Sequence, residues 1–348
     1  MRLTGIRAVS RTGVRMPANR SFERELAQLE ALGGRAADAE AVARVRKALG
    51  NQNNYLVAKA ARIAGDNFLV VLLPEVLSAF HRFFVDPVKN DPQCWAKNAL
   101  AKALVKLECR DADVFLCGLR HHQEEPVWGG NSDTAGTLRG TCTHALAGCD
   151  SMNNEQVLDL MLEPLVDLDK TVRMEAARAI GKVGGPSAAL LLKMRVLLRK
   201  EDAEVLGACF SALLSMEHTD IEQTILLVAD FLDDGEEAAA EAAFALAETH
   251  HQAALAALIN RRKRPADGWF GSVLDNAIAL TRLSAGMEFL LGIIEKDPRQ
   301  AASALEAISR VYHSPEVRAR VAESVARARS ERVEGAFRQH FPGLATGS

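Results

Sequence analysis

The stretch that decides the fold is VRMEAARAIGKVGGPSAALLLKMRVLL, residues 172–198. Small and aliphatic side chains recur three and four residues apart in its first half, so they form one apolar stripe along a helix. Residues 184–186, Gly-Gly-Pro, end that helix, because glycine loses backbone entropy in a helix and proline cannot donate the next hydrogen bond. The predicted stripe of this first helix consists of Val172, Ala176, Ala179, Ile180 and Val183.

A second helix follows the break. Its apolar stripe is predicted to contain Leu190, Leu191, Met194, Leu197 and Leu198. The alanines of the first helix let the second approach it closely. A hairpin of two such helices cannot bury both of its apolar stripes alone, so it requires similar hairpins on either side.

The composition favours helices packed on helices. Aromatic residues make up only 5% of the 348 residues, whereas strands prefer aromatic and β-branched side chains. The net charge of -3 gives no general attraction to nucleic acid or to an anionic membrane. No window reaches the roughly 18 uninterrupted apolar residues of a membrane span, and the first residues lack the apolar segment of a signal peptide. Six cysteines without a short-range framework indicate reduced thiols, so we expect a cytoplasmic protein with no membrane association.

Pairs of helices similar to the first recur along the chain about every 30 to 45 residues, a period typical of stacked helical hairpins. Cys142 and Cys209 stand where the hairpin of residues 172–198 has Ala176. Turn-forming residues, such as those at 233–235 and 297–298, separate the pairs. We therefore predict an all-α fold, a right-handed α-solenoid of about eight stacked helical hairpins.

The chain is predicted to divide into four segments. Residues 1–20, which contain five arginines, form a flexible basic arm. Residues 21–50 form two capping helices, because the terminal unit of a solenoid needs a polar outer face. Residues 51–330 form the repeat solenoid with an insertion near residues 120–137. Residues 331–348 form a C-terminal cap and tail.

The hairpin of residues 172–198 also carries a family resemblance. Asp169 precedes its first helix, Arg173 lies early in it, and Ala176-Ala177 and Ile180-Gly181 follow. This pattern resembles the HEAT-like repeat of bacterial proteins, of the type first described in phycobilisome lyases. The resemblance implies that the aspartate and the arginine pair with neighbouring repeats in a ladder. It covers most of residues 50 to 330 as an architecture, and it implies no particular activity, because the family is mostly scaffolds with a few enzymes. Residues 315–318 match the pattern in part and 138–139 more loosely, and the arginine is missing at 205–206 and 273–274.

The most unusual stretch is the insertion of residues 118–139. It breaks the repeat with a long polar connection, and long loops on a rigid scaffold often carry function. The alternative is a solvated insertion whose Trp128 packs back on the neighbouring hairpin. The candidate residues for binding a partner or ligand are Arg120, His121, His122, Glu124, Trp128, Asp133 and Arg139.

A metal site is a more specific form of this hypothesis, but the spacing of the candidate ligands in the sequence disfavours it. Zinc ligands usually come in close pairs such as C-x2-C, and the chain contains none. Some HEAT-like enzymes bind iron through repeated His-Glu dipeptides, and the chain contains none of these either. We therefore predict no metal and no cofactor. The candidate metal ligands are Cys117, His121, His122, Cys142, His144 and Cys149.

Nucleic acid is a further alternative. Arg261, Arg262, Lys263 and Arg264 form a basic cluster close to two aromatic residues. Against it, the second helices, which we expect to line the concave face, alternate in charge, whereas phosphate tracking needs a continuous positive groove. Cations at the end of a helix also complement its dipole, so nucleic-acid binding is disfavoured.

The hypothesis favoured by the sequence is a non-enzymatic scaffold that presents a solenoid surface to another protein. Searches for H-E-x-x-H, G-x-S-x-G, G-x-x-x-x-G-K and C-x-x-C find no catalytic motif. The alternatives that stay open are an enzyme, ligand or metal site on residues 120–139, and nucleic-acid binding on the concave face.

Overall fold

The computed structural model describes residues 17–32, 38–217, 220–265 and 268–342. Contacts group the chain into two compact units, residues 1–145 and 146–348. The predicted basic arm of residues 1–20 therefore lies mostly outside the described residues, and so does the tail after residue 342.

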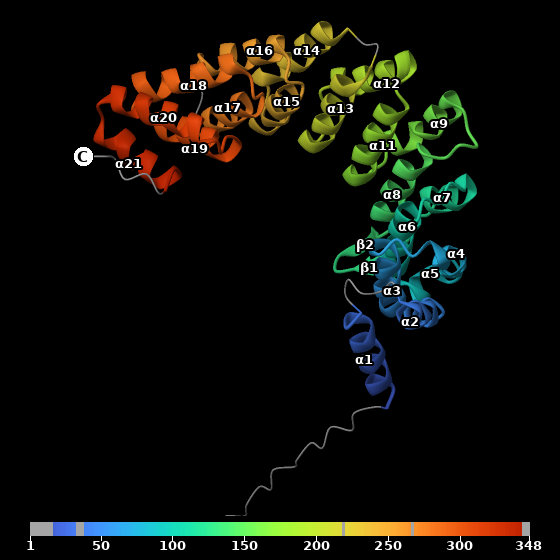
Figure 1. The fold of residues 1–348 in the computed structure, drawn as a ribbon. Coiled ribbons are helices and arrows are strands. Elements are labelled where there is room, and N and C mark those ends of the chain that lie inside the picture. The colour runs from blue at the N-terminus through green and yellow to red at the C-terminus, as the bar shows by residue number, and fades with distance from the viewer. Residues whose placement is uncertain (1–16, 33–37, 218–219, 266–267, 343–348) are drawn as a thin grey trace, which may run out of the picture. The chain divides into compact units, whose positions relative to one another are not determined.

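The first unit consists of short helices, with one small sheet inserted (Figure 1). Its core lies between α3 and α6, where a Cβ added to Gly65 would come within 3.1 Å of the Ala103 Cα. The two helices can therefore pack with their backbones close together. Its elements are α1 (Pro17–Glu30), α2 (Ala39–Leu49), α3 (Asn54–Asp66), η2 (Val70–Leu72), α4 (Leu73–Arg82), α5 (Pro87–Asn90), η3 (Pro92–Cys94), α6 (Trp95–Lys106), α7 (Ala112–Leu119), β1 (Glu124–Val127), β2 (Gly130–Asp133) and α8 (Gly136–Leu146), the last of which ends at the boundary.

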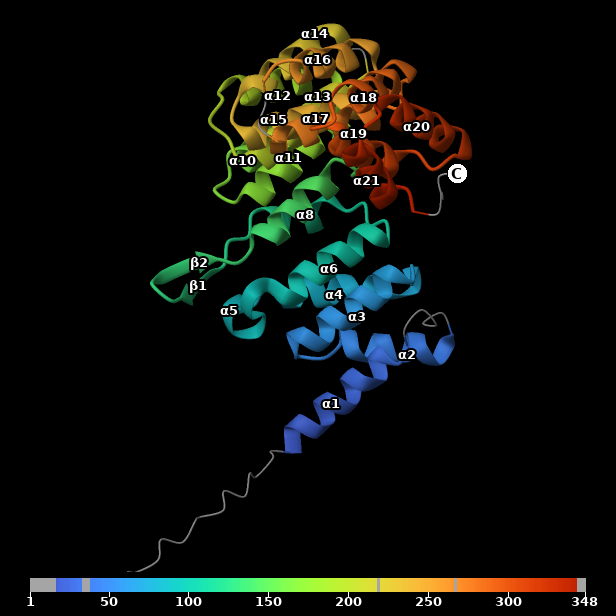
Figure 2. The same cartoon turned by 90° about the vertical axis from the view of Figure 1, so that its left-hand side faces the viewer.

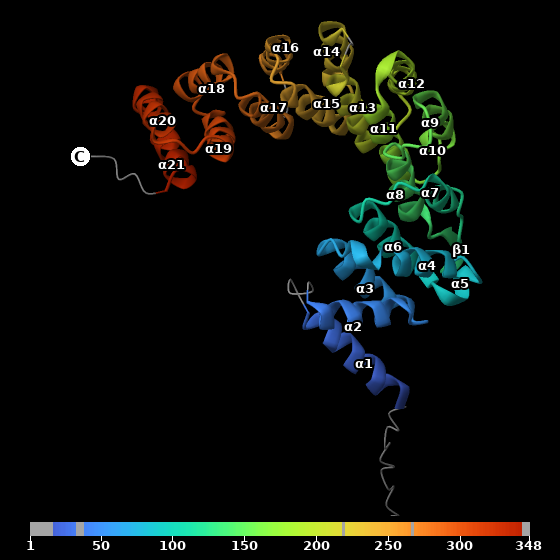
Figure 3. The same cartoon turned by 45° about the vertical axis from the view of Figure 1, so that its right-hand side comes forward.

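The second unit is a stack of helical hairpins in two rows (Figures 1 and 3). The first helices of successive hairpins, α11, α13, α15, α17 and α19, form one row, and the second helices form the other. Its elements are α9 (Asn154–Leu160), α10 (Leu162–Leu165), α11 (Lys170–Val183), α12 (Gly185–Leu197), α13 (Ala203–Ser215), α14 (Ile221–Ala229), η4 (Asp230–Asp233), α15 (Glu236–Glu248), α16 (Gln252–Arg262), α17 (Gly268–Leu280), α18 (Ser284–Lys296), α19 (Ala301–Val311), α20 (Pro315–Ala328) and α21 (Glu331–His340).

The predicted fold class is confirmed: the chain is an all-α solenoid of stacked helical hairpins. The first row of the second unit packs closely because small residues meet there. A Cβ on Gly181 would lie 2.6 Å from the Cβ of Ala212 on the next first helix. Figure 3 shows this row on the inner side of the bend in the unit. The expectation that second helices line the inner side was wrong, because the small residues draw the first helices together instead.

The break after α11 falls where the sequence placed it. α11 ends at Val183, Gly184 adopts a φ of 69°, and Pro186 stands in the first turn of α12. Of the predicted stripe, Val172, Ala176, Ala179 and Ile180 are fully buried, and Val183 is half-buried.

The predicted stripe of α12 was wrong. The buried residues of this helix are Ala188, Ala189, Leu192 and Val196. The predicted residues lie on the other face: Leu191 is half-buried, and the exposed ones are Leu190, Met194, Leu197 and Leu198. Apolar residues occupy most of α12, so the helical period fits two opposite stripes, and packing against α11 and α13 selects the one with the smaller side chains.

Charged side chains link successive hairpins of this unit. Asp169 accepts a hydrogen bond from the Thr171 N–H at 2.8 Å and so caps α11. Arg173 reaches the next repeat, where its guanidinium lies 2.6 Å from Asp202. One repeat further on, Arg199 lies 2.7 Å from Asp234. Of the ladder that the family resemblance implied, Arg173 of α11 makes the link to Asp202 before α13. The link to Asp234 before α15 comes instead from Arg199 after α12, because α13 has no arginine early in its sequence.

Candidate functional site

The insertion is an ordered β-hairpin rather than an irregular polar connection. β1 and β2 pair antiparallel, with Glu124 opposite Asp133 and Val127 opposite Gly130. The two-residue turn between them is Trp128-Gly129, and Gly129 has a φ of 92°, which glycine adopts at little cost. Figure 2 shows the hairpin projecting from the helices of the first unit. A rigid support therefore carries the tip of this insertion into solvent.

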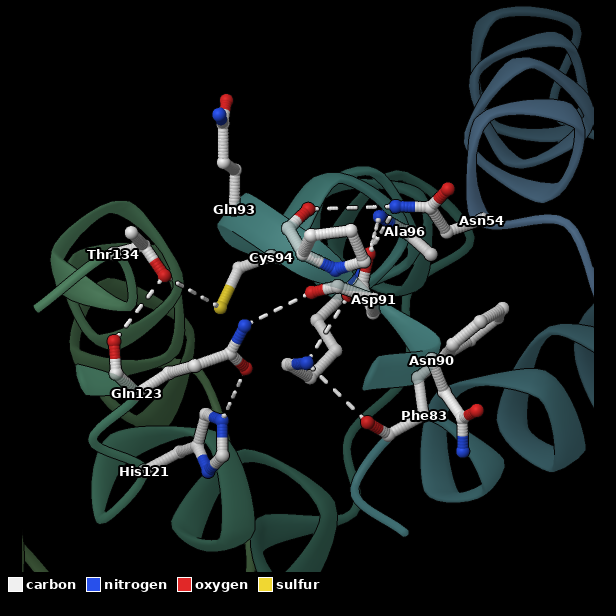
Figure 4. Close-up of polar contacts among 12 residues, drawn as sticks. Asn54, Phe83, Asn90, Asp91, Gln93, Cys94, Ala96, His121, Gln123 and Thr134 are labelled. Carbon is white, nitrogen blue, oxygen red and sulfur yellow. Dashed lines mark hydrogen bonds and ion pairs between the residues drawn. The ribbon is translucent and has the colours of Figure 1, made fainter. Parts of the chain in front are cut away.

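Polar contacts hold the base of the β-hairpin to the segment before α6. The Gln93 N–H donates to Glu125 Oε1 at 2.5 Å, and Gln123 Nε2 donates to the same oxygen at 2.6 Å and to the Asp91 carbonyl at 2.9 Å. Figure 4 shows the Gln123 amide between Asp91 and His121. Gln93 and Cys94 both have positive φ, 59° and 52°. Such backbone is strained in residues other than glycine and persists only where the surroundings enforce it.

A buried ion pair lies directly beneath these contacts (Figure 4). Lys97 Nζ lies 3.1 Å from Asp91 Oδ2, and both side chains are fully buried. The carboxylate also accepts hydrogen bonds from the Ala96 N–H at 2.8 Å, the Lys97 N–H at 3.0 Å and Asn54 Nδ2 at 3.0 Å. Lys97 Nζ donates to the Phe83 carbonyl at 3.3 Å. Both charges are therefore compensated within the protein, as buried charges must be.

Asp133, the last residue of β2, also holds the base of the hairpin in place. It accepts hydrogen bonds from the Gln123 N–H at 3.0 Å, the Ala135 N–H at 2.9 Å, His122 Nδ1 at 2.9 Å and Arg139 Nη1 at 2.5 Å. Burial alone would raise the pKa of Asp133, but these donors hold it well below its usual range. The carboxylate thus stays charged and keeps the hairpin in place.

The titratable side chains at the base of the hairpin have pKa values shifted by burial and hydrogen bonding. Burial raises the pKa of the Cys94 thiol to about 11, so it is protonated near pH 7. Burial opposes ionisation of Glu125, yet hydrogen bonds from Thr134, Gln123 and Gln93 lower its pKa. Burial lowers the pKa of His121. Within the described residues, no group of three or more His, Cys, Asp or Glu side chains could hold a metal ion.

The predicted site residues fall into two groups. Trp128 stands at the tip with a relative exposure of 103%, so it is not part of the core. Arg120, His122 and Glu124 are also exposed. In contrast, Asp133 and the buried Arg139 hold the base of the hairpin, and the carbonyl of His121 accepts from Arg139 Nη1 at 3.2 Å.

Sequence reasoning missed the buried polar residues of this base, Asp91, Lys97, Gln123 and Glu125, and the half-buried Thr134 that donates to Glu125. One signal was present. The sequence has two glycines, Gly129 and Gly130, directly after Trp128, and glycine-containing pairs mark the tight turns of β-hairpins.

The arginines of the basic cluster at the end of α16 form ion pairs within the protein. Arg261 lies 3.0 Å from Asp233 Oδ1, and Arg264 lies 2.9 Å from Asp233 Oδ2. Arg262 is bidentate to the buried Asp275, at 2.7 and 3.1 Å. Lys263 is exposed. Arginines held by carboxylates cannot track a phosphate backbone, so this geometry does not favour nucleic acid.

Large apolar side chains are exposed on three successive outer elements of the second unit. Leu168, which follows α10, is fully exposed, Leu190 on α12 is 68% exposed and Leu226 on α14 is 71% exposed. A single exposed apolar side chain is ordinary, but several on successive elements offer apolar area that a binding partner could cover. The exposed residues on and next to these helices, which we call the outer leucine face, are Leu162, Val166, Leu168, Leu190, Met194, Leu197, Leu198 and Leu226.

A match to a known protein family agrees with the architecture. The family of HEAT repeats matches residues 131–214. Among solved structures, human deoxyhypusine hydroxylase in complex with glycerol is similar, at 18% identity and a TM-score of 0.29, over 77% of this chain and 92% of that one. A comparison with curated proteins found no match. A search of the described helices for one long and apolar enough to cross a membrane found none. The chain contains HEAT-like repeats.

Proposed function

We propose that this chain is a non-enzymatic scaffold that binds a protein partner. The observation that carries the proposal is the outer leucine face. Each of its residues from α12 points away from the helix face that packs on the neighbouring hairpins, where Ala188, Leu192 and Val196 are buried. Covering such side chains with a partner removes apolar surface from water, which is the main driving force of protein association.

The tip of the β-hairpin is the second contact region in this proposal. Trp128 is held by a two-residue turn whose strands are fastened at their base through Glu125 and Asp133. Tryptophan on a rigid support is a common interface anchor, because little conformational entropy is lost when it binds. The exposed Arg120, His122 and Glu124 supply charged groups of both signs on the same insertion.

Other features support finer parts of the proposal. The contact of Arg173 with Asp202 of the next repeat, together with the cap that Asp169 provides to its own helix, supports repeats of the bacterial, phycobilisome-lyase type. Six cysteines, all free, support a reducing compartment such as the cytoplasm.

The test is affinity capture from cells that express the protein, with a matched set of variants. Leu190→Gln combined with Leu197→Gln removes two exposed leucines while keeping good helix formers. Ser187→Gln, at an exposed position early in the same helix, is the control. We expect proteins captured by the wild type and the control to be lost from the double variant, with an unchanged melting temperature. If capture survives both the double leucine change and Trp128→Ala, these surfaces do not bind a partner.

A further inference from the structure

A cavity of about 830 Å³ lies in the second unit, where the end of α16 meets the starts of α17 and α19 and the end of α21. Its size is within the range of small-molecule sites. Four separate segments of the chain contribute to its wall, so the cavity depends on the fold rather than on one flexible loop. Arg262, Lys263 and Arg264 line one side, and Arg299, Ser303 and His340 line others.

The charges around this cavity do not balance. The carboxylate that lines it belongs to Glu306, which is already paired with Arg310 at 2.6 Å. Lys263 and Arg299 carry no ion pair within the described part of the chain. Arg264 shares the carboxylate of Asp233 with Arg261. The field inside the cavity is therefore positive, and low-dielectric walls strengthen it.

A buried network fixes one wall of the cavity. Asp275 is fully buried and holds the Arg262 guanidinium through two hydrogen bonds, and the Ser303 hydroxyl donates to Asp275 Oδ2 at 2.8 Å. Ser303 Oγ also lies 3.0 Å from Ser272 Oγ. The two serines and Arg262 are therefore positioned before any ligand arrives, which reduces the entropy lost on binding.

The lining also indicates the kind of ligand. The starts of α17 and α19 bring the positive ends of two helix dipoles to the cavity, and the ends of α16 and α21 bring two negative ends, so the excess positive charge comes from the lysine and arginine side chains. Apart from His340, the lining contains no aromatic side chain on which a base could stack. Arginine and lysine donors reach the cavity from separate segments of the chain, which suits the tetrahedral oxygens of phosphate better than a planar carboxylate.

From this geometry we infer that the cavity binds a small polyanion that carries two or more phosphate groups. Lys263 from the end of α16 holds one phosphate, and Arg299 before α19 holds another. The cavity is far larger than a single phosphate, so a ligand with one phosphate would leave one of the two cations without a partner. This inference goes beyond the scaffold proposal and does not depend on it.

The test is isothermal titration calorimetry of the full chain with tripolyphosphate, in low salt. We expect binding that weakens as sodium chloride is added, because ions screen exposed charges. Lys263→Glu combined with Arg299→Glu should weaken binding by about tenfold or more, since attraction becomes repulsion at both ends. Lys102→Glu, which reverses an exposed lysine of the first unit, is the matched control and should bind like the wild type.

Three further ligands separate the alternatives. Orthophosphate should bind more weakly than tripolyphosphate; equal affinity would overturn the requirement for several phosphates. Citrate that bound as tightly as tripolyphosphate would overturn the preference for phosphate. A single-stranded oligonucleotide that bound without competition from tripolyphosphate would assign the cluster to nucleic acid instead.

Hydrogen exchange provides a measurement that does not depend on variants. Tripolyphosphate should slow amide exchange at the starts of α17 and α19 in the wild type, and leave α11 unchanged. If millimolar tripolyphosphate gives no heat of binding and does not slow amide exchange, the inference is overturned. So would a Lys263→Glu/Arg299→Glu protein that binds as tightly as the wild type.

Discussion

Removing the charge of Lys97 should destabilise the first unit strongly. Lys97→Met keeps the apolar stem of the side chain and deletes the ammonium group, which leaves the fully buried carboxylate of Asp91 without its counter-charge. The carboxylate would retain hydrogen bonds from two backbone N–H groups and Asn54, and these compensate only part of its desolvation. Breaking a buried ion pair by removing one partner costs about 3–5 kcal/mol, and we expect a loss of unfolding free energy in this range.

A double-mutant cycle isolates the pair itself. Asp91→Asn combined with Lys97→Met removes both charges, so its loss should be smaller than the sum of the two single losses by roughly 2 kcal/mol or more. Urea unfolding followed by circular dichroism measures the three free energies. Hydrogen exchange across α3 and α6 shows that the affected unit is the first. A loss under about 1 kcal/mol for Lys97→Met, or strictly additive losses, would refute the claim that the pair is buried and coupled.

Three further outcomes are expected. Trp128→Ala should leave the melting temperature nearly unchanged, because the side chain is fully exposed, while it weakens capture of the partner; a clear drop in melting temperature would contradict the anchor hypothesis. Ala176→Phe should overpack the fully buried contact of α11 and cost about 1–3 kcal/mol in urea unfolding, with Ala176→Ser as the smaller control. The lowered pKa of His121 means that the unfolded chain binds this proton more readily, so stability should be complete above about pH 6.5 and fall as the pH drops through the folded-state pKa. His121→Asn should reduce that fall in thermal unfolding measured between pH 7 and pH 5; an identical pH profile would show that His121 does not contribute.

The repeat architecture was predictable because its signals are local. The helical spacing of Val172, Ala176 and Ile180 identifies a helix, and the Gly-Gly-Pro break at residues 184–186 has a direct backbone cause. Nothing beyond one hairpin is needed to recognise either feature. Repetition along the chain then predicts stacking, because each hairpin leaves apolar faces uncovered.

The base of the β-hairpin was not predictable in the same way. Asp91 is buried by a contact with Asn54, 37 residues earlier in the chain, and Glu125 bonds to the backbone of Gln93, 32 residues before it. A sequence read alone treats such polar residues as solvated, since burial of a charge depends on partners that only the fold supplies. The sequence places the candidate site on the insertion, but which of its side chains hold the hairpin and which face solvent depends on the register of β1 and β2.

The mistaken stripe of α12 leads to the strongest argument for a partner. A helix that is apolar on all sides is normally covered on all sides. α11 and its neighbours cover the side of α12 that carries Ala188, Leu192 and Val196, and no described element of this unit covers Leu190 and Leu197. Those leucines are not needed for stacking, since the smaller stripe already provides it. Their apolar character therefore has no cause within the described hairpins, and a surface that packs against the outer leucine face would supply one.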